Sequence, residues 1–315
     1  MINLMYMTKV GIGGWATFTR HLHDVLVAHG QEVQIWKIGN RTEHFQRPFG
    51  PSHTYRNISE ADAQTLNTTG LTIIACLGKH YVELAAAMQR GCGARMVVHD
   101  TAESTNRMAL ERPWVIRRAL VPLFPGAVFM RHPYVRHEPI KCAKRSGALA
   151  TSRVDFDKNT AMILDAIRLG APIEIIGFEN RLYTKFKIVP KYPEWQQSTG
   201  LHPRTGAGSY AALCGAQFMV DLTDIKGDGG GTQYTFLEAW DAGAIPIIGS
   251  WWMRPKDDMQ PGINCLFASD AENLVSIFKR KYSTGLLADM RANGEHQLRK
   301  HSAKVLGPQI MEWLK

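Results

Sequence analysis

Short apolar runs alternate with amphipathic segments along most of the chain. Runs rich in β-branched and other apolar residues predict strands at 1–7, 32–38, 71–76, 94–99, 127–130, 147–153, 172–178, 216–222 and 244–250. The amphipathic segments predict helices at 15–29, 159–170 and 303–315. Strands that alternate with helices are typical of a parallel sheet with crossover helices, so the pattern predicts an α/β protein.

A new structural unit is expected to begin near residue 146. The basic link Lys144–Gly147 precedes a second series of strands and helices. The length of 315 residues also suits two domains of roughly 150 residues better than one. We therefore expect two successive Rossmann-like, doubly wound domains, at 1–146 and 147–315. The C-terminal helix belongs to the second domain by sequence, and the alternative is that it crosses back to the first.

The composition is that of an ordinary globular protein, with 45% hydrophobic and 21% charged residues. No apolar run approaches the ~20 residues of a membrane span. The N-terminus lacks the layout of a secretory signal and is read as a buried strand. The five cysteines are scattered and form no CxxC pair, so neither a disulfide framework nor a structural zinc site is indicated. A reducing cytoplasm fits best.

The chain is basic, with a net charge of +9 and a pI near 9.3. Such a balance favours a polyanionic partner, nucleic acid or an anionic surface, although many soluble proteins are basic without one. The excess is local, because residues 103–145 hold nine basic residues against three acidic ones.

A glycine-rich turn, Gly11-Ile12-Gly13-Gly14, follows the first predicted strand and opens a helix. Gly13 and Gly14 would let the backbone approach a ligand where helix N–H groups can bind an anion. A tight turn without a ligand is the alternative. The turn is not GxGxxG and no acidic residue closes the second strand, so an NAD site is disfavoured.

Two cations lie five residues apart in the turn after the strand at 147–153. Arg153 offers a guanidinium fork and Lys158 a point charge, and both can converge on one diphosphate. Alone, such a pair is usually part of a solvated surface. The intervening Asp155-x-Asp157 is a formal metal-binding DxD. We interpret it as turn chemistry with helix capping, and we expect no obligatory metal and no other cofactor.

A second glycine-rich loop, residues 227–231, also opens a helix. Its free N–H groups and the positive end of the helix dipole would face a pocket. Glu238, further along this helix, suits hydrogen bonds from ribose hydroxyls. The alternative is a glycine linker before an ordinary helix. The residues expected to bind the ligand here are Gly230, Gly231, Thr232, Tyr234 and Glu238.

The ordered set resembles the retaining GT-B glycosyltransferases of the GT4-like group. It runs from the first glycine turn through the Arg153/Lys158 pair and Leu237-Glu-Ala to Asn264-Cys-Leu266. The resemblance implies two Rossmann-like domains that face a cleft, and transfer from a nucleotide-sugar, UDP-sugars such as UDP-glucose being favoured. It places the Arg/Lys pair on the donor diphosphate and Glu238 on the ribose. The acidic residue that the group has eight positions earlier is Gly230 here, so nearby Asp228 or backbone N–H groups would replace it.

Within this group, Gln233–Glu238 and Val97–Asp100 are similar to segments of the phage DNA α-glucosyltransferases that act on hydroxymethylcytosine. This resemblance implies a hydroxylated or hydroxymethylated pyrimidine in double-stranded DNA as the acceptor. His99 and Asp100 end a predicted strand, where ligands of open α/β sheets gather. Asp100 would orient or deprotonate the acceptor hydroxyl, and His99 would contact the sugar or a donor phosphate. Helix capping by Asp100 is the alternative.

The basic stretch follows this dyad directly. It would bind DNA phosphates without reading sequence, and the target base would have to be flipped out of the duplex. The arginines expected to bind DNA are Arg107, Arg112, Arg117, Arg118, Arg131 and Arg136. One rival is the same enzyme class with a lipid or polysaccharide acceptor. A less favoured rival is a non-catalytic DNA-binding protein on the GT-B fold, in line with the departure at Gly230.

Overall fold

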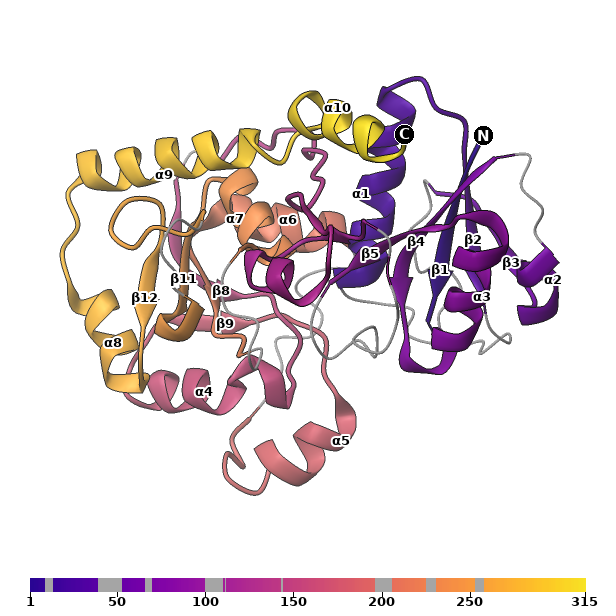
Figure 1. Cartoon of the computed structure of the whole chain (residues 1–315). Helices are drawn as coiled ribbons and strands as arrows, with labels where there is room; N and C mark the ends of the chain where they lie inside the picture. The colour runs from indigo at the N-terminus through magenta and orange to yellow at the C-terminus, as the bar shows by residue number, and fades with distance from the viewer. Residues whose placement is uncertain are drawn as a thin grey trace. The chain divides into compact units, whose positions relative to one another are not determined.

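The computed structural model describes residues 1–8, 14–38, 53–65, 70–99, 110, 112–142, 144–195, 206–224, 231–252 and 258–315 (Figure 1). The chain folds into two compact units. Unit 1 comprises Met1–Val135 and Arg299–Lys315, and unit 2 comprises Arg136–Leu298. Residues 136–145, which precede the boundary expected at 146, belong to unit 2 by their contacts. The C-terminal segment belongs to unit 1.

Unit 1 contains a parallel sheet of seven strands in the order β3-β2-β1-β4-β5-β6-β7. The strands are β1 (Ile2–Met7), β2 (Val33–Ile38), β3 (Tyr55–Ile58), β4 (Leu71–Leu77), β5 (Arg95–Val98), β6 (Trp114–Val115) and β7 (Val128–Phe129). The central strand β1 pairs on both sides, Ile2 lying opposite Val33 and Leu71. All six residues of β1 are buried, as expected for a parallel strand covered on both faces.

Helices surround this sheet. They are α1 (Gly14–Ala28), α2 (Glu60–Thr65), η1 (Lys79–Tyr81), α3 (Val82–Cys92), η3 (Arg118–Leu123) and α10 (Ala303–Trp313). Gly30, with a φ of +74°, ends α1 in the left-handed conformation that favours glycine. The C-terminal helix α10 packs against α1, far from it in sequence (Figure 1). This packing explains why the end of the chain belongs to unit 1.

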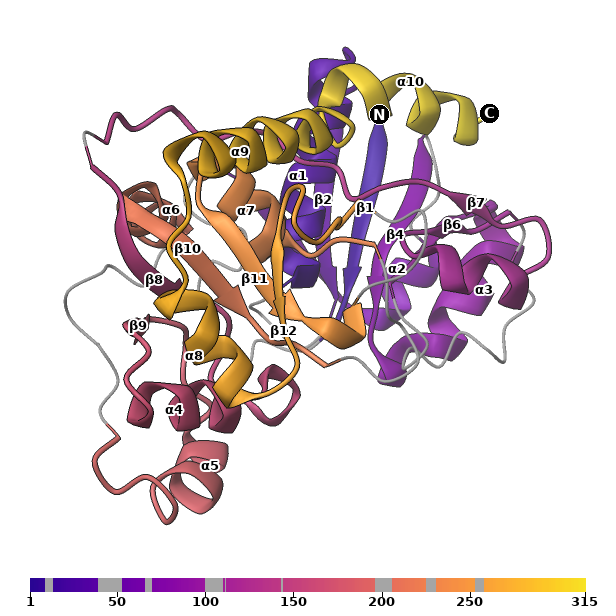
Figure 2. The same ribbon diagram turned by 90° about the vertical axis from the view of Figure 1, so that its left-hand side faces the viewer.

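Unit 2 contains a parallel sheet of five strands in the order β12-β11-β10-β8-β9. The strands are β8 (Ser146–Ala150), β9 (Ile173–Ile175), β10 (Ala216–Asp221), β11 (Ile245–Gly249) and β12 (Leu266–Ala268). The helices are η4 (Phe156–Lys158), α4 (Thr160–Arg168), α5 (Arg181–Tyr183), η5 (Thr184–Ile188), α6 (Gly206–Gly215), α7 (Tyr234–Ala242), η6 (Ser250–Trp252), α8 (Ala271–Lys279) and α9 (Thr284–Arg299). Helices α4 and α8 pack side by side (Figure 2), and Val220, Ile247 and Leu274 contribute to the core of this unit.

Each sheet reverses its winding direction once. In unit 1 the reversal lies between β1 and β4, and in unit 2 it lies between β8 and β10. Open α/β sheets bind ligands beyond the carboxyl ends of the strands at such a switch point. In unit 2 this position is occupied by the turn that follows Ala150 and by the residues that follow Asp221.

The α/β class and all nine expected strands are confirmed, as are the three expected helices. Strands β3, β6 and β12 were not expected. They are four, two and three residues long, too short to show an apolar pattern of their own. Among the described residues, no helix is both long and apolar enough to cross a membrane.

Candidate functional site

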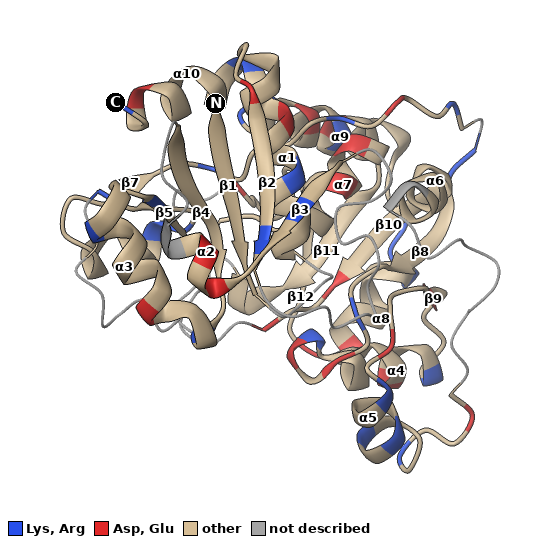
Figure 3. Cartoon of the chain, turned by 90° about the vertical axis from the view of Figure 1, so that its right-hand side faces the viewer, with Lys and Arg blue, Asp and Glu red and all other residues tan. Residues whose placement is uncertain are grey.

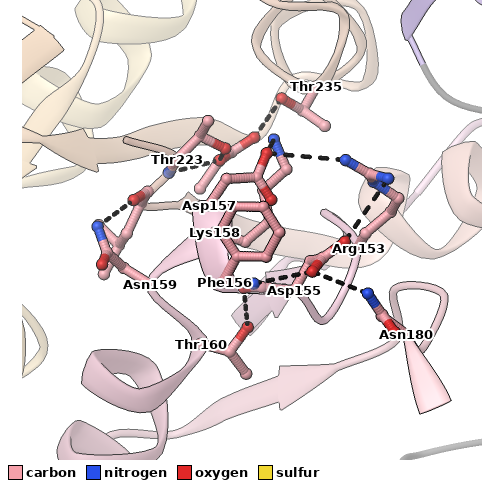
Figure 4. A network of polar contacts seen from close by, with 12 residues as sticks. Arg153, Asp155, Phe156, Asp157, Lys158, Asn159, Thr160, Asn180, Thr223 and Thr235 are labelled. Carbon is pink, nitrogen blue, oxygen red and sulfur yellow. Dashed lines mark hydrogen bonds and ion pairs between the residues drawn. The ribbon is translucent and has the colours of Figure 1, made fainter. Parts of the chain in front are cut away.

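The turn after β8 is fixed by its own side chains and by both neighbouring strands (Figure 4). The buried Asp155 carboxylate accepts hydrogen bonds from the Phe156 N–H at 2.9 Å and from Asn180 Nδ2 at 3.0 Å. Asn159 adopts a left-handed φ of +48° and donates from Nδ2 to Leu222 O at 2.9 Å. The turn is therefore held to the end of β10 on one side and to the segment after β9 on the other.

The two predicted diphosphate ligands meet in this turn. Asp157 Oδ2 lies 3.7 Å from Arg153 Nη2 and 3.2 Å from Lys158 Nζ, so one carboxylate holds both cations (Figure 4). The Arg153 side chain is 42% exposed and that of Lys158 is 13% exposed. The structure thus brings together the pair that we expect to bind a diphosphate, with the arginine accessible to a ligand. Asp155 and Asp157 act in capping and ion pairing, which is turn chemistry.

A buried carboxylate at the end of β10 was missed by the sequence analysis. Asp221 accepts hydrogen bonds from Thr223 N at 3.0 Å, from Thr223 Oγ1, and from Thr235 Oγ1 on α7. Three donors offset the cost of burying the charge. Asp221 therefore fixes the start of α7 against the end of β10. The available signal was an acidic residue closing the predicted strand 216–222.

The N-terminus of α7 faces this region without a side-chain cap. Gly231 has a φ of +76° and Thr232 is buried. The side chain of Gln233, the residue before the helix, makes no capping hydrogen bond. Tyr234 begins α7 and is buried, and Glu238 is half-buried in its second turn. Gly230 and Asp228 lie outside the described residues.

Several buried polar atoms around this turn have no hydrogen-bond partner among the described residues. They are Thr151 Oγ1, Ser152 Oγ, Asp157 Oδ1 and Gln233 Nε2. Such an atom costs about 1–3 kcal/mol when it is left unpaired. Three of them follow β8 and the fourth precedes α7, so they gather on the chain segments at the switch point. This polar, cationic surrounding fits the hydroxyl and phosphate groups of a nucleotide-sugar.

In unit 1, His99 follows the end of β5 and is buried. Its Nε2 lies 2.8 Å from Ala75 O, and its ring packs edge-on against Phe18 at 4.6 Å. Because a carbonyl can only accept, Nε2 carries the proton and Nδ1 is the acceptor of the neutral ring. Burial lowers the pKa of His99 to about 4, opposed by the hydrogen bond to Ala75 and assisted by the charge of Arg117. His99 is therefore a neutral polar contact near pH 7 and not an acid.

Two other predicted residues of this region, Gly13 and Asp100, lie outside the described residues, and their roles stay predictions. Gly14 is the first residue of α1 and is exposed. A Cβ added to Gly14 would meet no atom of the described residues within 4 Å.

The predicted DNA-binding arginines fall into two groups. In the first group, Arg112 and Arg118 are exposed and Arg131 is half-buried. The Arg118 guanidinium lies 4.2 Å from the centre of the Phe129 ring, and the Arg131 guanidinium lies 5.9 Å from it. Arg107 lies outside the described residues.

Arg117 and Arg136 both have protein partners in the structure. Arg117 is buried, and its Nε donates to His99 O at 3.1 Å, which fixes the backbone beside the predicted dyad. Arg136 belongs to unit 2, where Asp241 and Glu295 pair with its guanidinium. The Arg136 side chain is 48% exposed even so, and a role of either arginine in DNA binding stays a prediction. The charge count alone could not distinguish paired from unpaired arginines.

One group of metal-ligating side chains comes together among the described residues. The Asp24 carboxylate on α1 accepts from His23 Nδ1 at 2.9 Å and from His53 Nε2 at 2.7 Å. Burial acts to raise the pKa of Asp24, but the two imidazole hydrogen bonds hold it well below its usual range. This cluster joins α1 to the segment before β3 in unit 1, and it contains none of the predicted site residues.

Acidification is expected to destabilise the protein through His99. The folded pKa of about 4 lies below the ordinary histidine value of about 6.5, so between them the unfolded chain binds a proton that the folded protein does not. Stability is therefore lost as the pH falls through this window. In His99→Asn the free energy of unfolding should fall less steeply with decreasing pH, by up to roughly 1.4 kcal/mol per pH unit. Urea unfolding across this window measures the slope.

The exposed His80 provides the control for this measurement. His80→Asn should keep the slope of the unmodified protein, and equal slopes for all three proteins would contradict the buried, neutral state of His99.

The two Rossmann-like units, each with a parallel sheet and a single switch point, form the GT-B fold of glycosyltransferases. The chain is similar to Alr3699/HepE of Anabaena in complex with UDP and glucose, with a TM-score of 0.72, 12% identity, and 99% and 98% of the two chains covered. It is equally similar to an alpha-glucosyltransferase in complex with UDP and a 13-mer DNA containing an HMU base, with a TM-score of 0.72, 13% identity, and coverage of 100% and 99%. A glycosyltransferase from Rickettsia africae follows at a TM-score of 0.68 and 10% identity, with 100% and 97% covered. No protein-family model and no curated protein matches the sequence.

Proposed function

We propose that this protein transfers a sugar from a UDP-sugar to a hydroxylated or hydroxymethylated pyrimidine in double-stranded DNA, with retention at the anomeric carbon. The observation that carries the proposal is the pairing of Arg153 and Lys158 through Asp157 at the switch point of unit 2. A diphosphate that enters this turn meets two cations held at one place. The solved structures of similar fold that contain UDP support this donor.

The chemistry assigned to these residues is stabilisation of the leaving group. Negative charge develops on the diphosphate as the bond to the sugar breaks, and fixed cations act most strongly on charge that develops in the transition state. The positive end of the α7 helix dipole adds to this stabilisation. Glu238 is assigned to the ribose hydroxyls, and the turn at Gly13 and Gly14 to the anionic or sugar part of the donor.

The acceptor is assigned to DNA on two grounds. The chain carries a net charge of +9, and one alpha-glucosyltransferase of similar fold binds UDP together with DNA containing an HMU base. Asp100 is assigned to the acceptor hydroxyl, and His99 to a neutral contact with the sugar or the donor phosphate. Arg112, Arg118 and Arg131 remain the candidates for DNA phosphates in unit 1. We place the enzyme in the cytoplasm, where duplex DNA and UDP-sugars of a bacterial host are available together.

A nucleoside analysis tests the proposal. The protein is incubated with a panel of UDP-sugars and duplexes that contain cytosine, hydroxymethylcytosine or hydroxymethyluracil. The DNA is then digested to nucleosides, and their masses are measured by mass spectrometry. We expect the mass of one sugar residue to be added to one modified base only. Asp100→Asn should abolish the gain. Removal of divalent cations with EDTA should change the rate by less than about twofold, because the cations of the site are side chains.

The same experiment decides between the acceptors. UDP-sugar hydrolysis without a gain on any duplex would favour the second candidate, a lipid or polysaccharide acceptor. Alr3699/HepE, whose fold is equally similar, is in complex with UDP and glucose, so the fold by itself does not require a DNA acceptor. If the protein neither hydrolysed nor transferred the sugar of any donor, the enzymatic function itself would be contradicted.

A further inference from the structure

A short helical segment of unit 2 exposes a row of large apolar side chains. Helix α5 continues into η5, and Leu182, Phe186 and Val189 follow one another at helical spacing. Their exposed fractions are 69%, 63% and 44%. The opposite side of the segment is buried through Thr184 and Ile188. A single exposed apolar residue is ordinary, but a row of three on one side of a helix marks an interaction surface.

The same segment is strongly basic. Arg181, Lys185, Lys187 and Lys191 are exposed, and residues 181–193 contain no acidic side chain, although Lys191 pairs with Asp165 at 3.4 Å. In Figure 3 the ribbon of α5 is blue over much of its length, the colour given to Lys and Arg. Lys185 Nζ lies 5.3 Å from the centre of the Phe186 ring, so cations and apolar groups share one exposed side. We name residues 181–191 the basic apolar segment.

This segment begins beside the predicted diphosphate turn. Asn180, its preceding residue, donates to the Asp155 carboxylate at 3.0 Å, and Asn180 N donates to Val154 O at 3.1 Å. The helical rise of about 1.5 Å per residue places Lys185 and Phe186 within roughly 10 Å of Asn180 along the helix. The segment therefore lies within reach of a large acceptor that approaches a sugar whose diphosphate is bound by Arg153 and Lys158.

We propose that the basic apolar segment docks the duplex DNA acceptor, with its lysines on backbone phosphates and Phe186 and Leu182 against the groove or the opened base step. The inference rests on the proposed function and extends it, because it assigns part of the DNA interface to unit 2. A duplex presents phosphates on both rims of a groove and apolar base faces at a step that is being opened. Extrusion of the target base leaves such a step beside the flipped nucleotide.

The distribution of charge favours DNA over an anionic membrane. An interfacial membrane helix carries its basic residues on the side opposite to its apolar residues. Here the opposite side is packed into the protein, and the lysines lie among the apolar residues on the exposed side. This mixed surface matches the alternation of phosphate and base in a duplex.

A pair of matched variants tests the docking surface. Lys185→Ala/Lys187→Ala removes two exposed lysines two residues apart in the segment, and Lys279→Ala/Lys281→Ala removes an equally spaced exposed pair elsewhere in unit 2. The affinity of the full chain for a modified duplex is measured by fluorescence anisotropy at several salt concentrations. We expect the first variant to bind about tenfold more weakly and to lower the salt slope by about 2, one for each phosphate contact. The second should bind as the unmodified protein does.

A comparison of transfer rates tests the role of Phe186, and thermal denaturation tests whether the variants are folded. Phe186→Ser should lower the transfer rate to duplex DNA more than the rate to a single-stranded substrate, which needs no opened step. Both segment variants are first compared with the unmodified protein in thermal denaturation, so that loss of folding is recognised.

Equal affinities and salt slopes for the two lysine variants would overturn the docking surface while DNA glucosylation stands. A protein that transfers sugar but binds no duplex would overturn both proposals. Sedimentation of the unmodified protein with anionic phospholipid vesicles, lost in Lys185→Ala/Lys187→Ala while DNA affinity is kept, would assign the segment to a membrane and overturn the inference.

Discussion

Replacing Arg153 by alanine is expected to lower kcat/KM for the UDP-sugar by roughly 10²–10³-fold, the usual effect of removing one fixed donor from developing negative charge. The Arg153 guanidinium is the more exposed of the two cations that share Asp157, so it is the one placed to follow the departing diphosphate. Arg153→Lys keeps the charge but loses the fork, and it should recover part of the rate. Steady-state kinetics of donor hydrolysis measure both variants.

Lys158→Ala should give a loss of the same order, and the double variant should lose less than the product of the two effects, because both cations act on one diphosphate. Arg168 is the control, an exposed arginine of unit 2 that pairs with Glu194 at 2.6 Å. Arg168→Ala should retain the activity of the unmodified protein. If Arg153→Ala retained it as well, the diphosphate site would have to lie elsewhere.

The second large effect is expected from Gly177→Ala. A Cβ on Gly177 would lie 1.6 Å from Ser152 O and 3.0 Å from Thr151 O, both backbone atoms. The segment after β9 would therefore be pushed away from the residues that lead into Arg153. We expect a loss of about 1–3 kcal/mol or more in the free energy of unfolding, since backbone atoms yield less readily than side chains. Urea denaturation measures this loss.

The same substitution should weaken UDP binding about tenfold or more, because a displacement of about 1 Å at a positioning residue is enough to disturb a site. Isothermal titration calorimetry measures the affinity. Gly215→Ala in α6 is the control, since a Cβ there meets no atom within 4 Å. It should leave stability unchanged or raise it by up to about 1 kcal/mol. Similar stabilities for the two variants would show that β8 and β9 separate without cost.

The apolar pattern of the sequence was sufficient for the α/β class and for the long strands. Strand β1 is buried along its whole length, and a buried strand is apolar whichever neighbours it has. The proximity of Arg153 and Lys158 could also be predicted from the sequence, because the two residues belong to one local turn whose geometry depends on a few neighbouring positions.

Other features depend on partners that lie far away in sequence. Arg117 is buried against His99 O and Arg136 is paired with Asp241 and Glu295, so a row of arginines that is uniform in sequence is divided in space. The contact of α10 with α1 likewise joins the two ends of the chain. A residue's own type does not determine such contacts, because they follow from how distant strands and helices pack.

The sequence by itself determined the class of fold, the positions of most strands and the chemical types gathered in the two turns that we assign to the donor. Only the tertiary structure decided which charges remain accessible, that Asp221 anchors α7, and that the segment at Phe186 exposes its apolar side beside the turn at Asp155. The physical reason is the range of the interactions. Apolar periodicity and turn chemistry act over a few residues, whereas burial and ion pairing are decided by neighbours that only the folded chain brings together.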